Sequence, residues 1–402
     1  MQDEKKLNIA LINDTYYPNV DGVVKTVDSY ARELCRRGDS VTVCVPSQGK
    51  TEDAFPYRVI RTTSLPVLRT VFRITLPRLC PELRRYMRRE DIDIFHIHSP
   101  FALGRYAMRA AKRRGIPTVA TFHSKFYDDF MNYTHSRLIA WLGVRRIVRF
   151  FERADEVWAV SSGTAQTLRS YGYIGDIRIT ENGTDFSYPE DAELLRRKAA
   201  EHFKLPADRP IILFVGQQIW HKNLRLIIDS CALLKQRGVP YRAVIVGMGY
   251  DAEAIKHHAR ERGLSEEDML FTGVIRDREL LAGLELAASL FYFPSMYDNA
   301  PLVVREAAAM HLPSVLLQCS NAAEPTSDGD NAIHVPDDAK AAADIIERYL
   351  SEPERLREIG LRAGNTLGRR WEEIIPSVEE NYRRLISGGT SSAEKDIETA
   401  AH

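Results

Sequence analysis

Between Phe291 and Met310 the chain reads FYFPSMYDNAPLVVREAAAM. The apolar run that opens this stretch is typical of a buried strand, and Pro294 ends it. A polar loop follows, and Pro301 then favours the first turn of a helix. A strand, a loop and a helix N-terminus in this order form the place where α/β proteins bind anions, because unpaired N–H groups and the helix dipole converge there.

Two carboxylates in this stretch are candidates for ligand binding. Asp298 lies in the loop, and Glu306 follows eight residues later. A helical rise of about 1.5 Å per residue separates them by roughly 12 Å and keeps both on the same half of the helix surface. They could hold hydroxyls at the two ends of a polyhydroxylated anion, with its phosphates between them. The alternative is an Asp that caps a core helix and a solvated Glu, and this stretch alone does not decide between the two.

The composition is that of an ordinary globular protein. The chain has 402 residues, of which 44% are hydrophobic and 27% are charged, and its formal net charge is zero. This length suggests two or three domains, and the balanced charge gives no indication of nucleic-acid binding. The five cysteines are odd in number and lack CxxC spacing, which favours reduced thiols over disulfides or a zinc site. We recognise no signal peptide and no transmembrane run, so we expect a cytoplasmic protein.

Two basic segments carry apolar residues between their arginines. Residues 58–90 contain nine arginines and two glutamates, and residues 145–153 read RRIVRFFER. Such segments occur at membrane surfaces and also in ordinary helices with a solvated face. The residues alone leave both interpretations open.

The strand pattern predicts an α/β protein with two successive doubly wound parallel sheets. The strands of the first sheet are expected at residues 7–12, 40–45, 93–98, 118–122, 156–160 and 177–179. Those of the second sheet are expected at residues 211–215, 242–246, 270–271, 290–293, 314–317 and 333–335. The charged stretch between them has no strand and indicates a linker near residues 190–208. A GxGxxG run is absent, so the pattern does not indicate a dinucleotide site.

Histidines gather near two of the predicted strands. His96 and His98 share one strand face, but no third ligand stands at a matching spacing, so we expect no metal. His123 follows the carboxyl end of the next strand, where open α/β sheets bind ligands. We therefore take His123 as a candidate site residue, with a capping or supporting role as the open alternative.

Two Rossmann-like domains without a dinucleotide fingerprint suggest the GT-B architecture, and the motifs resemble the retaining glycosyltransferases of family 4. The hallmark of that family is an acidic residue followed by seven residues and a Glu, which here is Asp298 to Glu306. Other motifs in the family's order are Asp21-Gly22, His96-Ile-His-Ser99, Thr121-Phe-His123, Asn182-Gly183, Gly216 with Lys222, Gly247-Met-Gly249 and Ala323-Glu324.

The resemblance implies a domain plan. An N-terminal acceptor-binding domain would cover residues 1–190, and a nucleotide-sugar donor-binding domain would cover residues 205–375. Trp371-Glu372 resembles the start of the helix that crosses back to the first domain, so we expect a helix at residues 376–388 to pack there, with Pro376 kinking or interrupting it. The polar tail 389–402 is expected to be disordered.

The resemblance also implies catalytic and donor-binding roles. Lys222 would pair with the donor pyrophosphate, Asp298 would bond a hydroxyl of the donor sugar, and His123 would lie beside the reacting side of the sugar. Glu306 would accept from the ribose hydroxyls, and backbone N–H groups near Leu302 and Val303 would meet phosphate. The other expected donor-binding residues are Gly22, Gly216, Gln217, Val274, Asn299 and Ala300. The expected acceptor-side residues are Asp21, His123, Tyr127 and Asp128.

One departure from the family pattern concerns charge. The family usually has Gly-Arg where this chain has Gly216-Gln217, so one phosphate-binding cation is missing. The resemblance implies front-face transfer, in which the leaving phosphate assists deprotonation of the acceptor and positive groups stabilise that phosphate. It implies no metal and no other cofactor.

The acceptor is suggested by the stretch TFHSKFYDDFMNY, which ends at Tyr133. It resembles the corresponding segment of bacterial diacylglycerol glucosyltransferases. That implies α-glucosyl transfer from UDP-glucose to diacylglycerol, peripherally at the inner face of an anionic membrane contacted through residues 58–90 and 145–153. Two alternatives stay open: a family 4 enzyme acting on a soluble or polyprenyl-linked glycan, and a non-catalytic nucleotide-sugar-binding protein, which the missing arginine would suit.

Overall fold

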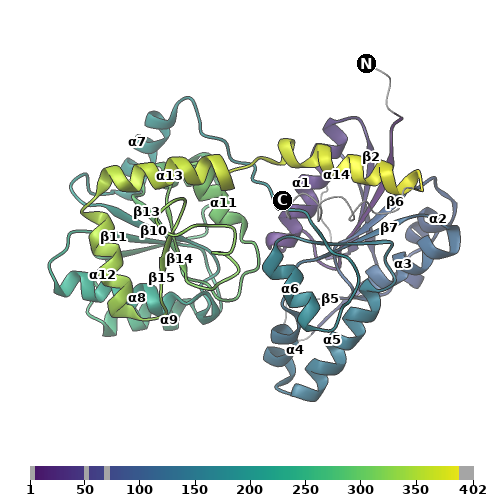
Figure 1. Cartoon of the computed structure of the whole chain (residues 1–402), viewed down its shortest axis with the longest axis horizontal. Helices are drawn as coiled ribbons and strands as arrows, with labels where there is room; N and C mark the ends of the chain where they lie inside the picture. Colours follow the sequence, from purple (N-terminus) through teal and green to yellow (C-terminus); the bar gives the residue numbers. More distant parts are fainter. Residues whose placement is uncertain (1–4, 49–53, 68–72, 389–402) are drawn as a thin grey trace, which may run out of the picture. The chain divides into compact units, whose positions relative to one another are not determined.

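The computed structural model describes residues 5–48, 54–67 and 73–388. The chain forms two compact units, one made of residues up to Asn182 together with those from Trp371 onward, and the other made of Gly183–Arg370. Each unit has a parallel sheet with helices on both faces (Figure 1). The α/β class with two doubly wound sheets is therefore confirmed. The tail 389–402, expected to be disordered, lies outside the described residues.

The first unit contains a parallel sheet in the order β3-β2-β1-β6-β7-β8-β9. Its strands are β1 (Asn8–Ile12), β2 (Ser40–Pro46), β3 (Arg58–Thr62), β6 (Ile94–Ile97), β7 (Thr118–Phe122), β8 (Glu156–Ala159) and β9 (Arg178–Ile179). The order reverses between β1 and β6. The chains that leave these two strands therefore cross to opposite faces of the sheet.

The helices of the first unit come from both ends of the chain. They are α1 (Gly22–Arg36), α2 (Pro81–Arg89), α3 (Ala102–Arg114), α4 (Phe126–Thr134), α5 (Arg137–Phe151), α6 (Ser162–Ser170) and α14 (Trp371–Ile386). Helix α14 packs against α1 (Figure 1). It begins at Trp371 and continues through Pro376, so the expected interruption at that proline does not occur.

The basic segment 58–90 is not a single helix. It forms β3, then the antiparallel pair β4 (Ser64–Pro66) and β5 (Arg73–Thr75), a 3₁₀ turn η1 (Pro77–Leu79) and α2. Arg58 pairs with Glu82 at 3.0 Å and with Glu90 at 2.7 Å. Arg61 donates to the backbone oxygen of Tyr17 at 3.1 Å. Part of the positive charge of this segment is thus used within the unit.

The second unit contains a parallel sheet in the order β12-β11-β10-β13-β14-β15. Its strands are β10 (Ile211–Val215), β11 (Arg242–Val246), β12 (Met269–Gly273), β13 (Leu290–Phe293), β14 (Ser314–Leu317) and β15 (Ile333–Val335). All six lie where the sequence predicts a strand. The order reverses between β10 and β13.

The helices of the second unit include one in the expected linker. They are α7 (Ala192–Phe203), α8 (Leu224–Gln236), α9 (Ala252–Glu261), α10 (Arg278–Ala287), α11 (Leu302–Ala309), α12 (Ala339–Leu350) and α13 (Pro353–Leu367). Helix α7 packs against α10 in the second unit. The approach is close, because a Cβ on Gly283 would lie 2.4 Å from the backbone oxygen of Leu195. The stretch near residues 190–208 is therefore part of the packed unit.

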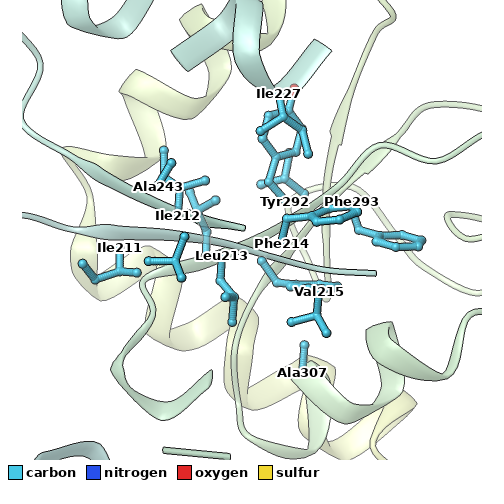
Figure 2. Close-up of a cluster of buried hydrophobic side chains, with 14 of the residues drawn as sticks. Ile211, Ile212, Leu213, Phe214, Val215, Ile227, Ala243, Tyr292, Phe293 and Ala307 are labelled. Atoms are coloured by element: carbon cyan, nitrogen blue, oxygen red, sulfur yellow. The ribbon is translucent and has the colours of Figure 1, made fainter. Parts of the chain in front are cut away.

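In the core of the second unit, strands β10 and β13 are covered by apolar side chains on both faces of the sheet. Both strands are buried along their whole length, as expected for central strands covered by helices on each side. Figure 2 shows Tyr292 pointing toward Ile227 of α8, while Val215 points toward Ala307 of α11. The ends of these two strands are thus fixed by packing, and the loops that follow them start from fixed points.

In the first unit, a buried hydrogen bond ties α14 to the sheet. The hydroxyl of Tyr382 lies 2.5 Å from Nδ1 of His96 on β6. The Tyr382 ring is stacked on Trp158 of β8, with ring centres 5.8 Å apart and an interplanar angle of 8°. Burial raises the pKa of Tyr382 well above its ordinary value, so the hydroxyl keeps its proton.

Replacing Tyr382 by Phe should destabilise the first unit by about 1–3 kcal/mol, because Nδ1 of His96 would remain buried without its partner. Hydrogen exchange at the β6 amides should become faster. Tyr241→Phe is the matched control: its hydroxyl donates to the Cys231 oxygen at 2.7 Å in the second unit, so β6 should be unaffected. Unchanged protection of β6 in the Tyr382 variant would contradict this role.

Candidate active site

Two loops of the second unit, together with helix α11, carry most of the predicted site residues. One loop follows β10 and the other follows β13, the strands that flank the reversal of strand order. Open α/β sheets bind ligands at this point, outside the carboxyl ends of the strands. On these loops and α11 lie Gly216, Gln217, Lys222, Asp298, Asn299, Ala300, Leu302, Val303 and Glu306. Val274 lies apart from them, exposed just after β12 at the edge of the sheet.

Lys222 and Asp298 form an ion pair across the two loops. The Nζ atom of Lys222 lies 2.5 and 2.6 Å from the two carboxylate oxygens of Asp298. Their side chains are only 12% and 19% exposed, so solvent screens this pair less than a surface pair. The ammonium also lies 5.6 Å from the centre of the Phe293 ring. Because a lysine ammonium has three donors, Lys222 can bind an anion while it keeps Asp298.

The loop that carries Lys222 is held by the glycines after β11. Gln218 donates its backbone N–H to the oxygen of Met248 at 3.1 Å and its side-chain amide to the oxygen of Gly247 at 2.7 Å. A Cβ on Gly247 would lie 1.9 Å from the Gly216 oxygen, and a Cβ on Gly249 would lie 2.2 Å from the Gln218 oxygen. The Gly-Met-Gly motif therefore lets two loops touch through their backbones.

The two glutamines at the position of the missing arginine differ in environment. Gln218 is buried, and its amide nitrogen is engaged by Gly247. Gln217 is exposed at the end of β10. Of the two, Gln217 is therefore the one that could offer its amide to a ligand.

Asn299 links the β13 loop to the loop after β14. Its side chain is buried, and its Oδ1 accepts from Nδ2 of Asn321 at 2.8 Å. The sequence analysis assigned no role to Asn321. Asn299 directly follows Asp298, so the hydrogen bond from Asn321 fixes the loop beside Asp298 from a third loop.

Glu306 on α11 is buried beside a cation from another helix. Nη1 of Arg278 lies 3.9 Å from Oε1 of Glu306, and the Arg278 guanidinium lies 4.2 Å from the centre of the Phe186 ring. Sequence reasoning missed Arg278. The sequence does hold a signal for it. Arg278 is the first residue of α10, where a positive charge is unfavourable beside the helix dipole, so an arginine at this position suggests a negatively charged partner.

At the carboxyl edge of the sheet in the first unit, Asp14 connects two loops through hydrogen bonds. This carboxylate follows β1 and accepts from Ser99 Oγ at 2.5 Å, from the backbone N–H of Leu103 at 3.0 Å and from Thr75 Oγ1 at 3.1 Å. Burial raises the pKa of Asp14 above its ordinary value. Asp14 thus ties the loop after β1 to the loop after β6.

Asp21 and Gly22 begin α1 in the same region. Oδ1 of Asp21 accepts from the backbone N–H of Val24 at 2.8 Å and caps the helix. Burial raises the pKa of Asp21. A Cβ on Gly22 would meet no atom within 4 Å, so packing among the described residues does not explain this glycine.

His123 follows β7, and its Nε2 lies 3.0 Å from Nδ1 of His98. Burial lowers the pKa of His123 to about 3, so its imidazole is neutral near neutral pH. Tyr127 and Asp128 follow in the first turn of α4, where Asp128 is exposed. The expected acceptor-side residues therefore all belong to the first unit, whereas Lys222 and Asp298 belong to the second.

Gly247→Ala should cost more stability than Gly263→Ala. Both glycines have positive φ, at 124° and 79°, but a Cβ on Gly263 would meet no atom within 4 Å. Backbone strain alone costs about 1–2 kcal/mol, and the clash with Gly216 adds to it at Gly247. Urea unfolding of the second unit measures both losses. Equal losses would show that the close approach of the two loops is not needed.

Two family models match the chain. The model described as "Glycosyltransferase Family 4" matches residues 20–188, and the model described as "Glycosyl transferases group 1" matches residues 196–365. Together they span most of both units.

Individual relatives and a solved structure agree with these matches. A GDP-mannose-dependent alpha-mannosyltransferase of Mycobacterium tuberculosis (strain CDC 1551 / Oshkosh) is 25% identical over 398 residues, which cover 96% of this chain and 99% of that protein. An alpha-monoglucosyldiacylglycerol synthase of Streptococcus pneumoniae (strain ATCC BAA-255 / R6) is 23% identical over 314 residues, which cover 77% of this chain and 70% of that protein. The structure of sucrose-phosphate synthase from Thermosynechococcus elongatus matches with a TM-score of 0.80 at 22% identity, covering 96% of this chain and 100% of that one. The chain belongs to the GT-B glycosyltransferases of family 4.

Proposed function

We propose that this glycosyltransferase moves a hexose from a nucleoside diphosphate sugar to a lipid acceptor such as diacylglycerol, and that the product is an α-glycoside. The observation that carries the donor half is the Lys222–Asp298 pair at the ends of β10 and β13, with Glu306 on the helix that follows. An ammonium and a helix N-terminus suit a diphosphate, and carboxylates suit sugar hydroxyls. No metal and no other cofactor takes part in the proposed reaction.

Seven of the donor-site residues have a stated role in this proposal. Lys222 and the backbone N–H groups near Leu302 and Val303 bind the diphosphate. Glu306 accepts from the ribose hydroxyls, and Asp298 bonds a hydroxyl of the hexose. Gln217 contributes a neutral amide where the family usually has an arginine. Val274, on the loop after β12, is proposed to contact the donor.

The proposed chemistry is front-face transfer with retention. The bond between the anomeric carbon and the leaving phosphate oxygen breaks, and the acceptor oxygen bonds to the same face of that carbon. The acceptor proton moves to the leaving phosphate, whose negative charge Lys222 stabilises. Both carboxylate oxygens of Asp298 already accept from Lys222, which supports a binding role for Asp298 over a nucleophilic one.

The identity of the donor sugar and of the acceptor rests on the motifs and the relatives. The TFHSKFYDDFMNY segment supports UDP-glucose and diacylglycerol, and the Streptococcus pneumoniae relative is a monoglucosyldiacylglycerol synthase. The mycobacterial relative is GDP-mannose-dependent, so GDP-mannose is the second donor to test.

The decisive experiment combines a donor panel with a lipid extract. UDP-glucose, UDP-galactose and GDP-mannose are each incubated with the protein and with lipid or glycan acceptors, and the anomeric configuration of the product is read by NMR. We expect an α-glucosyl lipid from UDP-glucose. Transfer only to a soluble or polyprenyl-linked glycan would replace the lipid acceptor. Binding of a nucleotide sugar without any turnover would instead indicate a non-catalytic binding protein.

Glu306→Ala should weaken donor binding by about 10-fold or more, since a loss of about 1.4 kcal/mol corresponds to a factor of ten. Calorimetric titration with UDP-glucose, or with the nucleotide that binds best, measures the effect. Glu193→Ala is the control, because that glutamate is 85% exposed on α7. Donor affinity equal to that of the wild type in the Glu306 variant would remove this residue from the donor site.

A membrane surface is the proposed second partner, and α5 supplies the contact. Its N-terminal half exposes apolar side chains, three of its four arginines follow on the same helix, and Arg145 lies 4.6 Å from the ring centre of Trp141. The exposed apolar residues are Leu138, Ile139, Trp141 and Leu142. Apolar residues of this kind enter the headgroup region, and nearby arginines favour anionic lipids by about 1 kcal/mol each. Within the described ranges, no helix is long and apolar enough to cross a bilayer.

The double variant Leu138→Glu with Leu142→Glu should lose vesicle binding. The two side chains are 65% and 53% exposed, so the substitutions disturb no core. Flotation with vesicles of phosphatidylcholine, with and without phosphatidylglycerol, measures the loss. Leu361→Glu is the control, because Leu361 is 51% exposed on α13 of the second unit. Equal flotation of all variants, or no flotation of the wild type, would rule out this surface.

A further inference from the structure

Three histidines stand side by side at the carboxyl edge of the first sheet. His96 lies on β6, His98 follows the end of that strand, and His123 follows the end of β7. The two strands are parallel neighbours, with His96 paired to Val119 in the register. The rings of His96 and His98 have centres 4.0 Å apart, and those of His98 and His123 have centres 5.3 Å apart.

The three rings differ in how many of their nitrogens form hydrogen bonds. Both nitrogens of His96 are engaged, Nδ1 with the hydroxyl of Tyr382 at 2.5 Å and Nε2 with that of Thr121 at 2.6 Å. His98 is 3% exposed, and its Nδ1 lies 3.0 Å from Nε2 of His123. Its Nε2 has no hydrogen-bond partner among the described residues. The fixed neighbours of His98 leave its ring little freedom to turn.

Proton counting limits what the His98–His123 contact can be. Burial lowers the pKa of both imidazoles well below the ordinary value, so each ring carries one proton near neutral pH. A hydrogen bond between them needs one of the two facing nitrogens to be protonated and the other to be bare. Either His98 donates from Nδ1, or His123 donates from Nε2.

The unpartnered atom of His98 separates these two cases. If His123 donated, the proton of His98 would stand on Nε2 as a buried N–H without an acceptor. If His98 donates, Nε2 is a bare nitrogen, which leaves an acceptor unused. Unsatisfied buried N–H groups are rarer than unsatisfied acceptors, and each costs the full desolvation of the group. The geometry therefore favours donation from His98.

We propose that His98 is a positioning residue whose Nδ1–H bond to Nε2 of His123 holds the proton of His123 on Nδ1, so that His123 acts as a neutral hydrogen-bond donor toward the acceptor hydroxyl. The role toward the acceptor rests on the proposed function. In this assignment His123 does not take up the acceptor proton, which agrees with transfer of that proton to the leaving phosphate. His96, engaged on both sides, holds the ring of His98 by packing against it at an interplanar angle of 34°.

The first test reads the tautomer without any turnover. Protein labelled with ¹⁵N at histidine is examined by long-range ¹⁵N–¹H correlation near neutral pH, and His123→Asn identifies the His123 signals. We expect a protonated Nδ1 and a bare Nε2 for His123. In His98→Ala, the His123 proton should move toward Nε2. In His98→Asn, whose side-chain amide can replace the Nδ1–H donor, it should stay on Nδ1. A protonated Nε2 in the wild-type His123 would overturn the assignment.

The second test separates positioning from structure through activity. His98→Ala should lower kcat by about 10-fold or more with little change in donor KM, because an interaction made mainly in the transition state is lost. His98→Asn should restore most of kcat. Equal losses in both variants, with folding intact by circular dichroism, would count against the positioning role. The expected tautomer in a protein without any transferase activity would support the histidine assignment and overturn the proposed function.

Discussion

The reversal of strand order in each parallel sheet is the constraint on which the rest of the structure depends. Every strand of such a sheet ends at the same edge, and at the reversal two neighbouring strands send their chains to opposite faces. In the second unit these strands are β10 and β13, both buried from end to end. Lys222 and Asp298 are 76 residues apart in the sequence, yet they meet at 2.5 Å because their loops start from these fixed strand ends. The order of the strands alone therefore determines that these two loops lie next to each other.

The pairing of charges then determines how the second unit can meet an anion. Lys222 is neutralised by Asp298, and Arg278 stands beside Glu306. Under the proposed function, a diphosphate must share Lys222 with Asp298 and draw the rest of its stabilisation from backbone N–H groups at the start of α11. Gln217 can add only a neutral amide. Donor binding is therefore coupled to the geometry of one ion pair, more than it would be with an arginine beside Gly216.

The sequence predicted the strands of the sheets well and the side-chain partners poorly, because an apolar run is local in the sequence whereas a side-chain contact depends on the fold. Central strands are apolar on both faces, so their runs are visible without the fold, and all six strands of the second sheet were found in this way. The strand β3 was missed because Arg58 and Arg61 break its apolar run, which a strand at the sheet edge tolerates. Arg278 and Asn321 were missed because their contacts depend on three-dimensional packing, not on spacing. Asn321, for example, lies 22 residues from Asn299.

The two sheets reverse their strand order in the same way, but the side chains at their carboxyl edges differ in charge. The edge of the second unit holds Lys222 and Asp298 as an ion pair, whereas the edge of the first unit holds His98 and His123 as neutral rings. A buried neutral imidazole forms hydrogen bonds but adds no charge, so it can contact a hydroxyl without attracting a phosphate. Under the proposed function, the charged diphosphate of the donor therefore favours the second unit, and the uncharged acceptor hydroxyl can meet the neutral rings of the first. This difference acts on the diphosphate alone, because the carboxylates of the second unit also suit hydroxyls.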